Sequence, residues 1–305
     1  MTLIQLKPRF LWLLILLGAS TMANADEFKT YCIGRLLIDI PVSFELVNQS
    51  GWAYVSEFER LGPGGHEEAE RIAYEKAQRL RNKETFDDDV PQVFMDMQRV
   101  GKVHIISRKD DPAYWGDYPP LNIWFEDAYF SSKEVIFRAT TVMNEADADT
   151  QRQKLLRVAN ATRPREPDEI PRGEGSCVAG AFIALPPEGE VQGATFRLPN
   201  EDPIGVRISF SLRKPGEREL DLEAAQSNIG SRITIAGLPG RYGKDYGREI
   251  FYMASVGQQT TDQQFGLSLD VRYFDRRRPF GVEPFTREKA DQIWDRLVDS
   301  ARIRR

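Results

Sequence analysis

The sequence predicts an α+β protein made of two similar tandem domains, each a mainly antiparallel sheet packed with two helices. The segment Tyr31–Pro41 recurs as Ser176–Pro186, with the cysteine, the apolar run and the final proline in register. Each copy opens a half of similar length, and each half ends in a stretch whose apolar residues have helical spacing. Strand and helix patterns alternate irregularly, which favours α+β sandwiches over a doubly wound parallel sheet. We interpret the repeat as an internal duplication.

The first 25 residues have the pattern of a secretory signal peptide. Lys7 and Arg9 precede an unbroken apolar run over residues 10–18, and residues 23–25 form a small-x-small cleavage site. The mature chain is therefore expected to start at Asp26. An uncleaved anchor is disfavoured because the run is shorter than the ~20 residues that a bilayer requires. We expect export to the periplasm, with no stable membrane insertion after cleavage.

Charge and length limit the partners and the number of domains. Loss of the signal segment changes the formal net charge from −5 to about −7. This acidity argues against nucleic-acid and anionic-membrane partners, which select clustered Lys and Arg. On a prior of ~150 residues per domain, the expected order is an N-terminal α+β domain (26–162), a linker (163–174) and a C-terminal α+β domain (175–305). Three prolines among charges predict a stiff, extended linker.

In the first half, β-branched and aromatic runs predict six strands, and two stretches with helical periodicity predict helices. The strands are expected at Ile33–Ile40, Phe44–Val47, Trp52–Phe58, Val100–Ser107, Leu121–Phe130 and Glu134–Met143, and the helices at His66–Asn82 and Asp147–Ala161. The second and third strands are expected to form a hairpin.

The second half repeats this order. Strands are expected at Val178–Leu185, Ala194–Leu198, Val206–Leu212, Arg232–Ala236, Glu249–Val256 and Phe265–Phe274, and helices at Leu220–Ile229 and Thr286–Ile303. Thr286 is an acceptable N-cap for the last helix.

Residues that could carry catalysis or hold a metal are few. The chain has two histidines, His66 and His104, and no Gly-x-Ser-x-Gly elbow. We interpret His66 as a first-turn helix residue and His104 as a strand residue. Metal sites usually show closely spaced ligand pairs, and the sequence has none. Asp87–Asp89 is interpreted as a solvated acidic turn and Gly62–Gly65 as a helix-entry turn. We therefore predict no catalytic residues, no cofactor and no metal.

Cys32 and Cys177 are the only cysteines, and they occupy equivalent positions in the two copies. An even pair in an exported chain indicates a disulfide. Two buried free thiols are the alternative. A Cys32–Cys177 bond would fix the mutual orientation of the two halves.

Two segments between expected strands have the composition of protein-binding loops, Asp110–Pro120 and Gly237–Arg248. Rigid aromatics mixed with Gly, Asp and Arg are typical of such loops. The alternative is that these aromatics cap the ends of a sheet core. The candidate partner contacts are Tyr114, Trp115, Tyr118, Arg241, Tyr242, Tyr246 and Arg248.

The opening Tyr-Cys-Ile-Gly-Arg-Leu-Leu-Ile-Asp-Ile-Pro and its echo Gly-Ser-Cys-Val-Ala-Gly-Ala-Phe-Ile-Ala resemble the two-domain immunity proteins that act on type VI secretion lipase effectors of the fourth class. The resemblance extends over nearly the whole mature chain. The second copy departs slightly, with Ala179-Gly180 where the first has Gly34-Arg35. The resemblance implies a periplasmic monomer, not an enzyme, that clamps a phospholipase of α/β-hydrolase fold between its two domains in a one-to-one complex. The clamp would stop the lipase from opening its lid at a membrane.

Two other functions stay open from the sequence alone. A carboxylate-dependent exported hydrolase would need a deep cleft with two carboxyl groups within glycosidase range. A periplasmic lipid-binding or structural module would need a closed apolar cavity inside one lobe.

Overall fold

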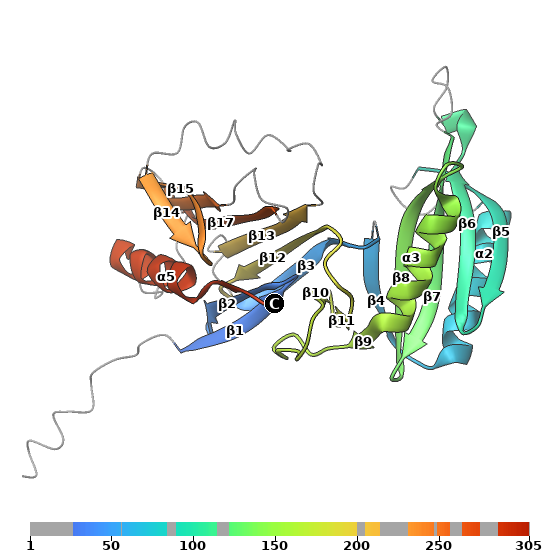
Figure 1. The fold of residues 1–305 in the computed structure, drawn as a ribbon, viewed down its shortest axis with the longest axis horizontal. Helices are drawn as coiled ribbons and strands as arrows, with labels where there is room; N and C mark the ends of the chain where they lie inside the picture. Colours follow the sequence, from blue (N-terminus) through green and yellow to red (C-terminus); the bar gives the residue numbers. More distant parts are fainter. Residues whose placement is uncertain are drawn as a thin grey trace, which may run out of the picture.

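The computed structural model describes residues 27–55, 57–83, 90–114, 122–199, 205–213, 231–246, 249–256, 264–274 and 286–304. The chain forms two lobes, each organised around one large antiparallel sheet (Figure 1). This arrangement is the predicted α+β class. The two lobes have different sheets, with five and seven strands, so the structure does not show a tandem duplication.

The five-stranded lobe is a three-layer sandwich with a helix on each face of the sheet (Figure 1). Its strand order is β4-β8-β7-β6-β5, all antiparallel. The elements are β4 (Glu57–Pro63), α2 (His66–Arg81), β5 (Gln92–Val100), β6 (Val103–Asp110), a 3₁₀ turn η2 (Pro112–Tyr114), β7 (Ile123–Ser132), β8 (Val135–Asn144) and α3 (Ala148–Ala161). Alternate β6 residues face opposite helices, so Ile106 packs with α2 and Ile105 with α3.

The seven-stranded lobe has the order β14-β15-β16-β17-β13-β12-β3. Its bounds are β3 (Glu45–Ala53), β12 (Glu190–Arg197), β13 (Gly205–Arg213), β14 (Ser231–Ile235), β15 (Leu238–Tyr246), β16 (Glu249–Val256) and β17 (Gln264–Phe274). Helix α5 (Arg287–Ser300) packs on this sheet through Trp294, which is 2 % exposed and stacks on Tyr252 at 5.3 Å between ring centroids. Thr286 is the N-cap of α5, as predicted. Its hydroxyl oxygen accepts a hydrogen bond from the Lys289 backbone N–H at 3.2 Å.

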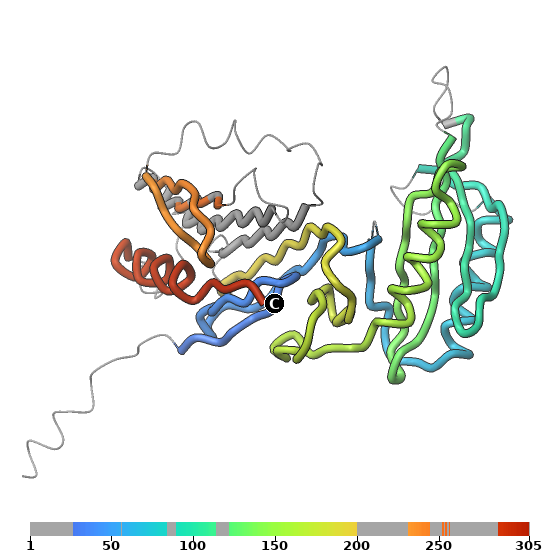
Figure 2. The backbone as a smooth tube through the Cα atoms, viewed as in Figure 1, coloured from blue at the N-terminus to red at the C-terminus, as the bar shows by residue number. Residues whose placement is uncertain are grey.

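The strand pairing joins the beginning of the chain to its end. Strand β3 lies at the edge of the sheet that carries β12 to β17. A small sheet, β1-β2-β18, pairs β1 (Phe28–Ile33) and β2 (Leu36–Pro41) with β18 (Arg302–Ile303). Residues 28–53 therefore pack with the C-terminal strands rather than with residues 57–162. The chain leaves the seven-stranded lobe after β3 and returns to it through the segment that leads to β12 (Figure 2).

The repeated segments form two similar hairpins rather than single strands. The expected strand Ile33–Ile40 is wrong, because β1 and β2 pair across a turn at Gly34-Arg35. Likewise β10 (Ser176–Val178) and β11 (Ala181–Ile183) pair across Ala179-Gly180. Each turn places one glycine in the left-handed region, with φ 59° at Gly34 and 65° at Gly180. The glycine moves by one position between the copies, so the likeness is local.

Three other sequence-based expectations differ from the structure. The expected hairpin turn at residues 48–51 is absent, because Gly51 extends the chain (φ 145°) and residues 45–53 form one continuous strand, β3. The expected loop Gly237–Arg248 is largely strand β15. The expected extended linker is packed: β9 (Thr162–Pro164) pairs with β11, and Arg165 is 2 % exposed.

Several predictions fall outside the described residues. These are the signal segment 1–25, the acidic turn Asp87–Asp89 and the helix Leu220–Ile229. Within the described residues, the helices are all too short or too polar for a membrane span.

Candidate protein-binding groove between the lobes

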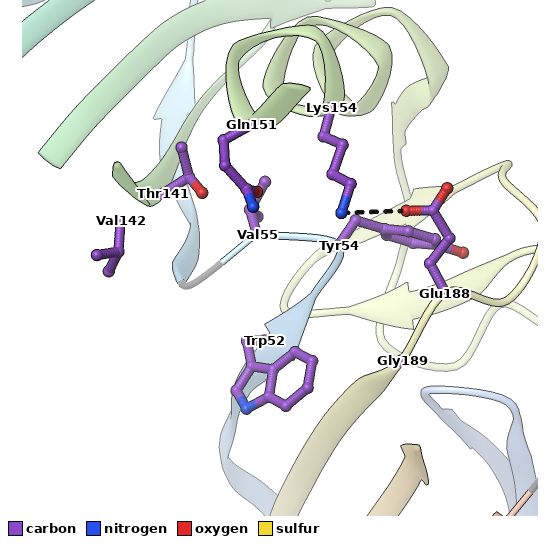
Figure 3. A pocket seen from close by; sticks show the side chains of 9 residues that line it. All are labelled: Trp52, Tyr54, Val55, Thr141, Val142, Gln151, Lys154, Glu188 and Gly189. Atoms are coloured by element: carbon purple, nitrogen blue, oxygen red, sulfur yellow. Dashed lines mark ion pairs between the residues drawn. The ribbon is translucent and has the colours of Figure 1, made fainter. Parts of the chain in front are cut away.

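A groove of about 320 Å³ lies where the two lobes meet (Figure 3). The seven-stranded lobe supplies Trp52 from β3 and Gly189 just before β12, and the five-stranded lobe supplies Val142 from β8 and Lys154 from α3. The other lining residues are Tyr54, Val55, Thr141, Gln151 and Glu188. We call this set the inter-lobe groove. Trp52 is 38 % exposed and Val142 39 %, so the groove presents apolar surface to solvent.

Tyr54 lies where the chain crosses between the lobes, and its backbone is strained. Its φ is +66°, a left-handed value that is uncommon for a bulky residue. Its hydroxyl donates to Leu185 O at 2.8 Å and accepts from Arg35 Nη2 at 2.9 Å. These contacts hold the ring at the groove and offset the backbone strain.

Behind Tyr54 lies a buried charged network. Arg35 Nε contacts Glu190 Oε1 at 2.7 Å, and the same carboxylate accepts a short hydrogen bond from the Ser176 hydroxyl. Burial raises the pKa of Glu190, while Ser176 and Arg35 act in the opposite direction. The network joins the β1–β2 turn, β10 and β12. It therefore fixes the seven-stranded side of the groove.

Ion pairs also join the two lobes along the groove. Arg157 Nη1 lies 3.2 Å from Glu188 Oε1, and Lys154 Nζ lies 4.0 Å from Glu188 Oε2. Figure 3 shows the pair of Lys154 and Glu188. Both cations are on α3, whereas Glu188 lies in the segment before β12. These pairs are partly exposed, so each contributes little to stability.

The structure contains the predicted disulfide between Cys32 and Cys177, with Cα atoms 5.8 Å apart. It joins the two similar hairpins. The backbones of Gly34 and Cys177 also exchange two hydrogen bonds, at 2.8 and 2.9 Å. The disulfide thus ties the first hairpin, which packs in the core of the seven-stranded lobe, to the second hairpin, which packs in the core of the five-stranded lobe.

Two of the predicted contact residues, Arg241 and Tyr242, have side chains that the structure describes, and these two do not line the groove. Tyr242 is partly buried and stacks on Trp294 at 6.3 Å, as an aromatic at a sheet core does, while Arg241 is exposed. Tyr114 lies in η2 and Tyr246 in β15, but the structure does not describe their side chains. Trp115, Tyr118 and Arg248 lie outside the described residues.

Sequence reasoning missed Trp52, Val142, Lys154 and Glu188, which come from four separate segments. The one local signal is Trp52, a large apolar residue in a strand whose neighbours Ser50 and Gly51 are small and exposed.

Comparison with known proteins finds a family model that matches just under half of the chain. Residues 29–170 match the model of the Tle cognate immunity protein 4 N-terminal domain. This segment is therefore similar to the N-terminal domain of the Tle cognate immunity protein 4 family. Within the matched segment, β1 to β3 pack in the seven-stranded lobe and β4 to β8 form the sheet of the other lobe.

Solved structures of immunity proteins have the same fold. A chain in the crystal structure of the Tle4–Tli4 complex matches at 20 % identity with a TM-score of 0.67, covering 93 % of this chain and 99 % of that one. The apo immunity protein TplEi of the type VI secretion system from Pseudomonas aeruginosa matches at 21 % identity with a TM-score of 0.65, covering 91 % and 97 %. TplEi complexed with an "L" peptide matches at 22 % identity with a TM-score of 0.62, covering 92 % and 99 %. No curated protein matches the chain.

Proposed function

We propose that this protein is a periplasmic immunity protein that binds a cognate type VI secretion lipase effector and inhibits it in a one-to-one complex. The observation that carries the proposal is the match of residues 29–170 to the immunity protein model, combined with a fold shared over 93 % of the chain with a chain of the Tle4–Tli4 complex. Immunity proteins inhibit effectors and are not enzymes, and we assign the same role here.

The inter-lobe groove is the surface that we propose for effector contact. Trp52 and Val142 supply exposed apolar area from opposite lobes, and Lys154 and Glu188 supply charge beside them. Aromatic anchors surrounded by polar groups are typical of protein interfaces. Two lobes that grip one partner also raise affinity, because the second contact is intramolecular once the first has formed. The segments 110–120 and 237–248 stay candidate contacts.

The shape of the groove favours a binding protein over the two alternatives. The groove is lined by a single carboxylate, Glu188, which is already paired with Arg157. A glycosidase-type site requires two carboxyl groups that flank the substrate. The groove is also open, rather than a closed apolar cavity of the kind that encloses a lipid.

The direct test is a lipase assay. The cognate lipase effector is assayed on phospholipid vesicles with increasing amounts of the purified protein. We expect activity to fall linearly and to end at one equivalent of inhibitor. Unchanged lipase activity at a tenfold excess would overturn the proposal.

A further inference from the structure

The two histidines of this chain stack on each other, although 38 residues separate them in the sequence. His66 is the first residue of α2, and His104 lies on β6, on the sheet face that α2 covers. Their ring centroids are 5.0 Å apart with an interplanar angle of 26°. Glu70 follows His66 by one helical turn and therefore lies on the same face of α2. One potential ligand atom from each of the three residues lies within 4.8 Å of the others.

Two ring nitrogens in this cluster have no hydrogen-bond partner. They are Nδ1 of His66 and Nε2 of His104, and both atoms are buried. His104 as a whole is 2 % exposed, so its unpaired nitrogen costs free energy in the structure as it stands. An imidazole nitrogen without a hydrogen-bond partner is available as a metal ligand.

We propose that His66, His104 and Glu70 form a binding site for a divalent transition metal, with Zn²⁺ or Co²⁺ as the matching ions. Two imidazoles and one carboxylate are a ligand set that zinc accepts, with a fourth position left for water. Two ligands of a tetrahedral zinc are ~3.4 Å apart. The three side chains therefore close on the ion by rotation, and the metal ties the start of α2 to β6. Glu68 is excluded as a ligand because Arg71 holds its carboxylate.

Arg99 competes with the metal for His66. Its Nη2 lies 3.0 Å from His66 Nε2. Arginine only donates, so this contact makes Nε2 an acceptor and places the ring proton on Nδ1. Metal binding at Nδ1 moves that proton to Nε2 and breaks the contact, while binding at Nε2 displaces Arg99 directly. Arg99 is exposed and its charge also opposes a cation. Removing Arg99 should therefore strengthen metal binding. If the two histidines only packed on each other and bound no metal, removing Arg99 would have no such effect.

The chain suits a direct test, because it has two histidines in total and both cysteines are in the disulfide. The untagged chain, purified after export and treated with chelator, is titrated with CoCl₂ while the visible absorption of tetrahedral Co²⁺ is recorded. Zn²⁺ affinity is then measured by competition with a chromophoric chelator. We expect one equivalent of each metal to bind, and a melting temperature that rises with Zn²⁺ concentration.

Variants separate this site from adventitious binding. Glu70→Gln and His66→Gln should weaken Zn²⁺ binding at least ~10-fold, whereas the matched control Glu67→Gln on the same turn should change it less than ~2-fold. Arg99→Gln should strengthen binding about 3-fold or more. Circular dichroism checks that each variant is folded. The proposal fails if the wild-type chain binds Zn²⁺ no better than His66→Gln, or if Arg99→Gln leaves the affinity unchanged or weaker.

Discussion

Arg35 and Glu190 form a buried ion pair in which Arg35 Nε lies 2.7 Å from Glu190 Oε1, and their side chains are 4 % and 1 % exposed. Arg35 comes from the turn of the first hairpin and Glu190 from the start of β12, so the pair joins residues 155 positions apart. The same guanidinium holds Tyr54 and the Leu185 carbonyl. One charged contact thus supports the side of the groove that the seven-stranded lobe contributes.

Replacing one member of this pair should destabilise the protein strongly. Arg35→Met leaves the Glu190 carboxylate buried without a countercharge, which costs about 3–5 kcal/mol in the free energy of unfolding. The double variant Arg35→Met/Glu190→Met should recover much of that loss. Urea denaturation of the set measures both effects. The control Arg157→Met removes a half-exposed partner of Glu188 and should cost no more than ~1 kcal/mol. If Arg35→Met and Arg157→Met lowered the free energy of unfolding by the same amount, the assigned role of Arg35 would be contradicted.

The Cys32–Cys177 bond should stabilise the fold mainly by constraining the unfolded chain. The bond closes a loop of 145 residues. The loop-closure model gives an upper limit of ~5 kcal/mol for that length. The variant Cys32→Ala/Cys177→Ala should therefore lose about 2–5 kcal/mol, measured by denaturation without reductant. Reductant should lower the stability of the wild-type protein and leave the double variant unchanged. A wild-type protein that is insensitive to reductant after unfolding and refolding would argue against the bond.

Lys76 should make stability rise with pH in the alkaline range. Burial lowers its pKa to about 8, and the nearby Arg108 charge adds to the shift. In the unfolded chain the pKa returns to ~10.4. Between these values the unfolded chain binds more protons than the folded one, so the free energy of unfolding increases with pH.

The variant Lys76→Met removes this effect. Because Lys76 is partly exposed and solvent screens its charge, the variant should be more stable than the wild type at pH 7 by only about 1–2 kcal/mol, and the difference should shrink as the pH approaches 10. Denaturation curves at pH 7, 8.5 and 10 measure it. A difference that stays constant over this range would show that Lys76 does not titrate as described.

The sequence predicts the helices well because their signals are local. The apolar positions of α2, α3 and α5 recur at helical spacing, and Thr286 caps α5 as predicted. The strands are harder to predict. The turn at Gly34-Arg35 interrupts an apolar run that otherwise looks continuous, and Gly51 looks like a turn although it extends β3. Each error concerns one glycine, Gly34 or Gly51. The φ angle of that glycine decides whether the strand turns or continues.

The groove could not be predicted because its residues meet only through the tertiary fold. Trp52 and Val142 reach the same groove from β3 and β8, which lie in different sheets. The pairing of β3 with β12 brings residues 45–53 to the seven-stranded lobe, and no local sequence pattern indicates this pairing. The stacked histidines show the same limit. His66 and His104 occupy the predicted helix and strand positions, but their contact requires α2 to pack on β6.

The groove also predicts where single substitutions should affect effector binding. Trp52→Ala removes a partly exposed aromatic from the centre of the proposed contact. A central aromatic of an interface usually costs at least ~2 kcal/mol on truncation. We therefore expect the dissociation constant for the effector to rise about 30-fold, measured by surface binding kinetics, with most of the change in the off-rate. An effect below about 2-fold would place Trp52 outside the interface.

The most direct test of the central claim compares two valines of equal exposure. Val142 is 39 % exposed and lines the inter-lobe groove, whereas Val100 is 38 % exposed and ends β5 at the far edge of its sheet. The variants Val142→Asp and Val100→Asp introduce the same charged side chain at the two positions. Calorimetric titration then measures the affinity of each variant for the cognate lipase. We predict that Val142→Asp weakens binding at least ~10-fold, while Val100→Asp binds like the wild type. Equal affinities of both variants, or a loss confined to Val100→Asp, would contradict effector binding in the groove.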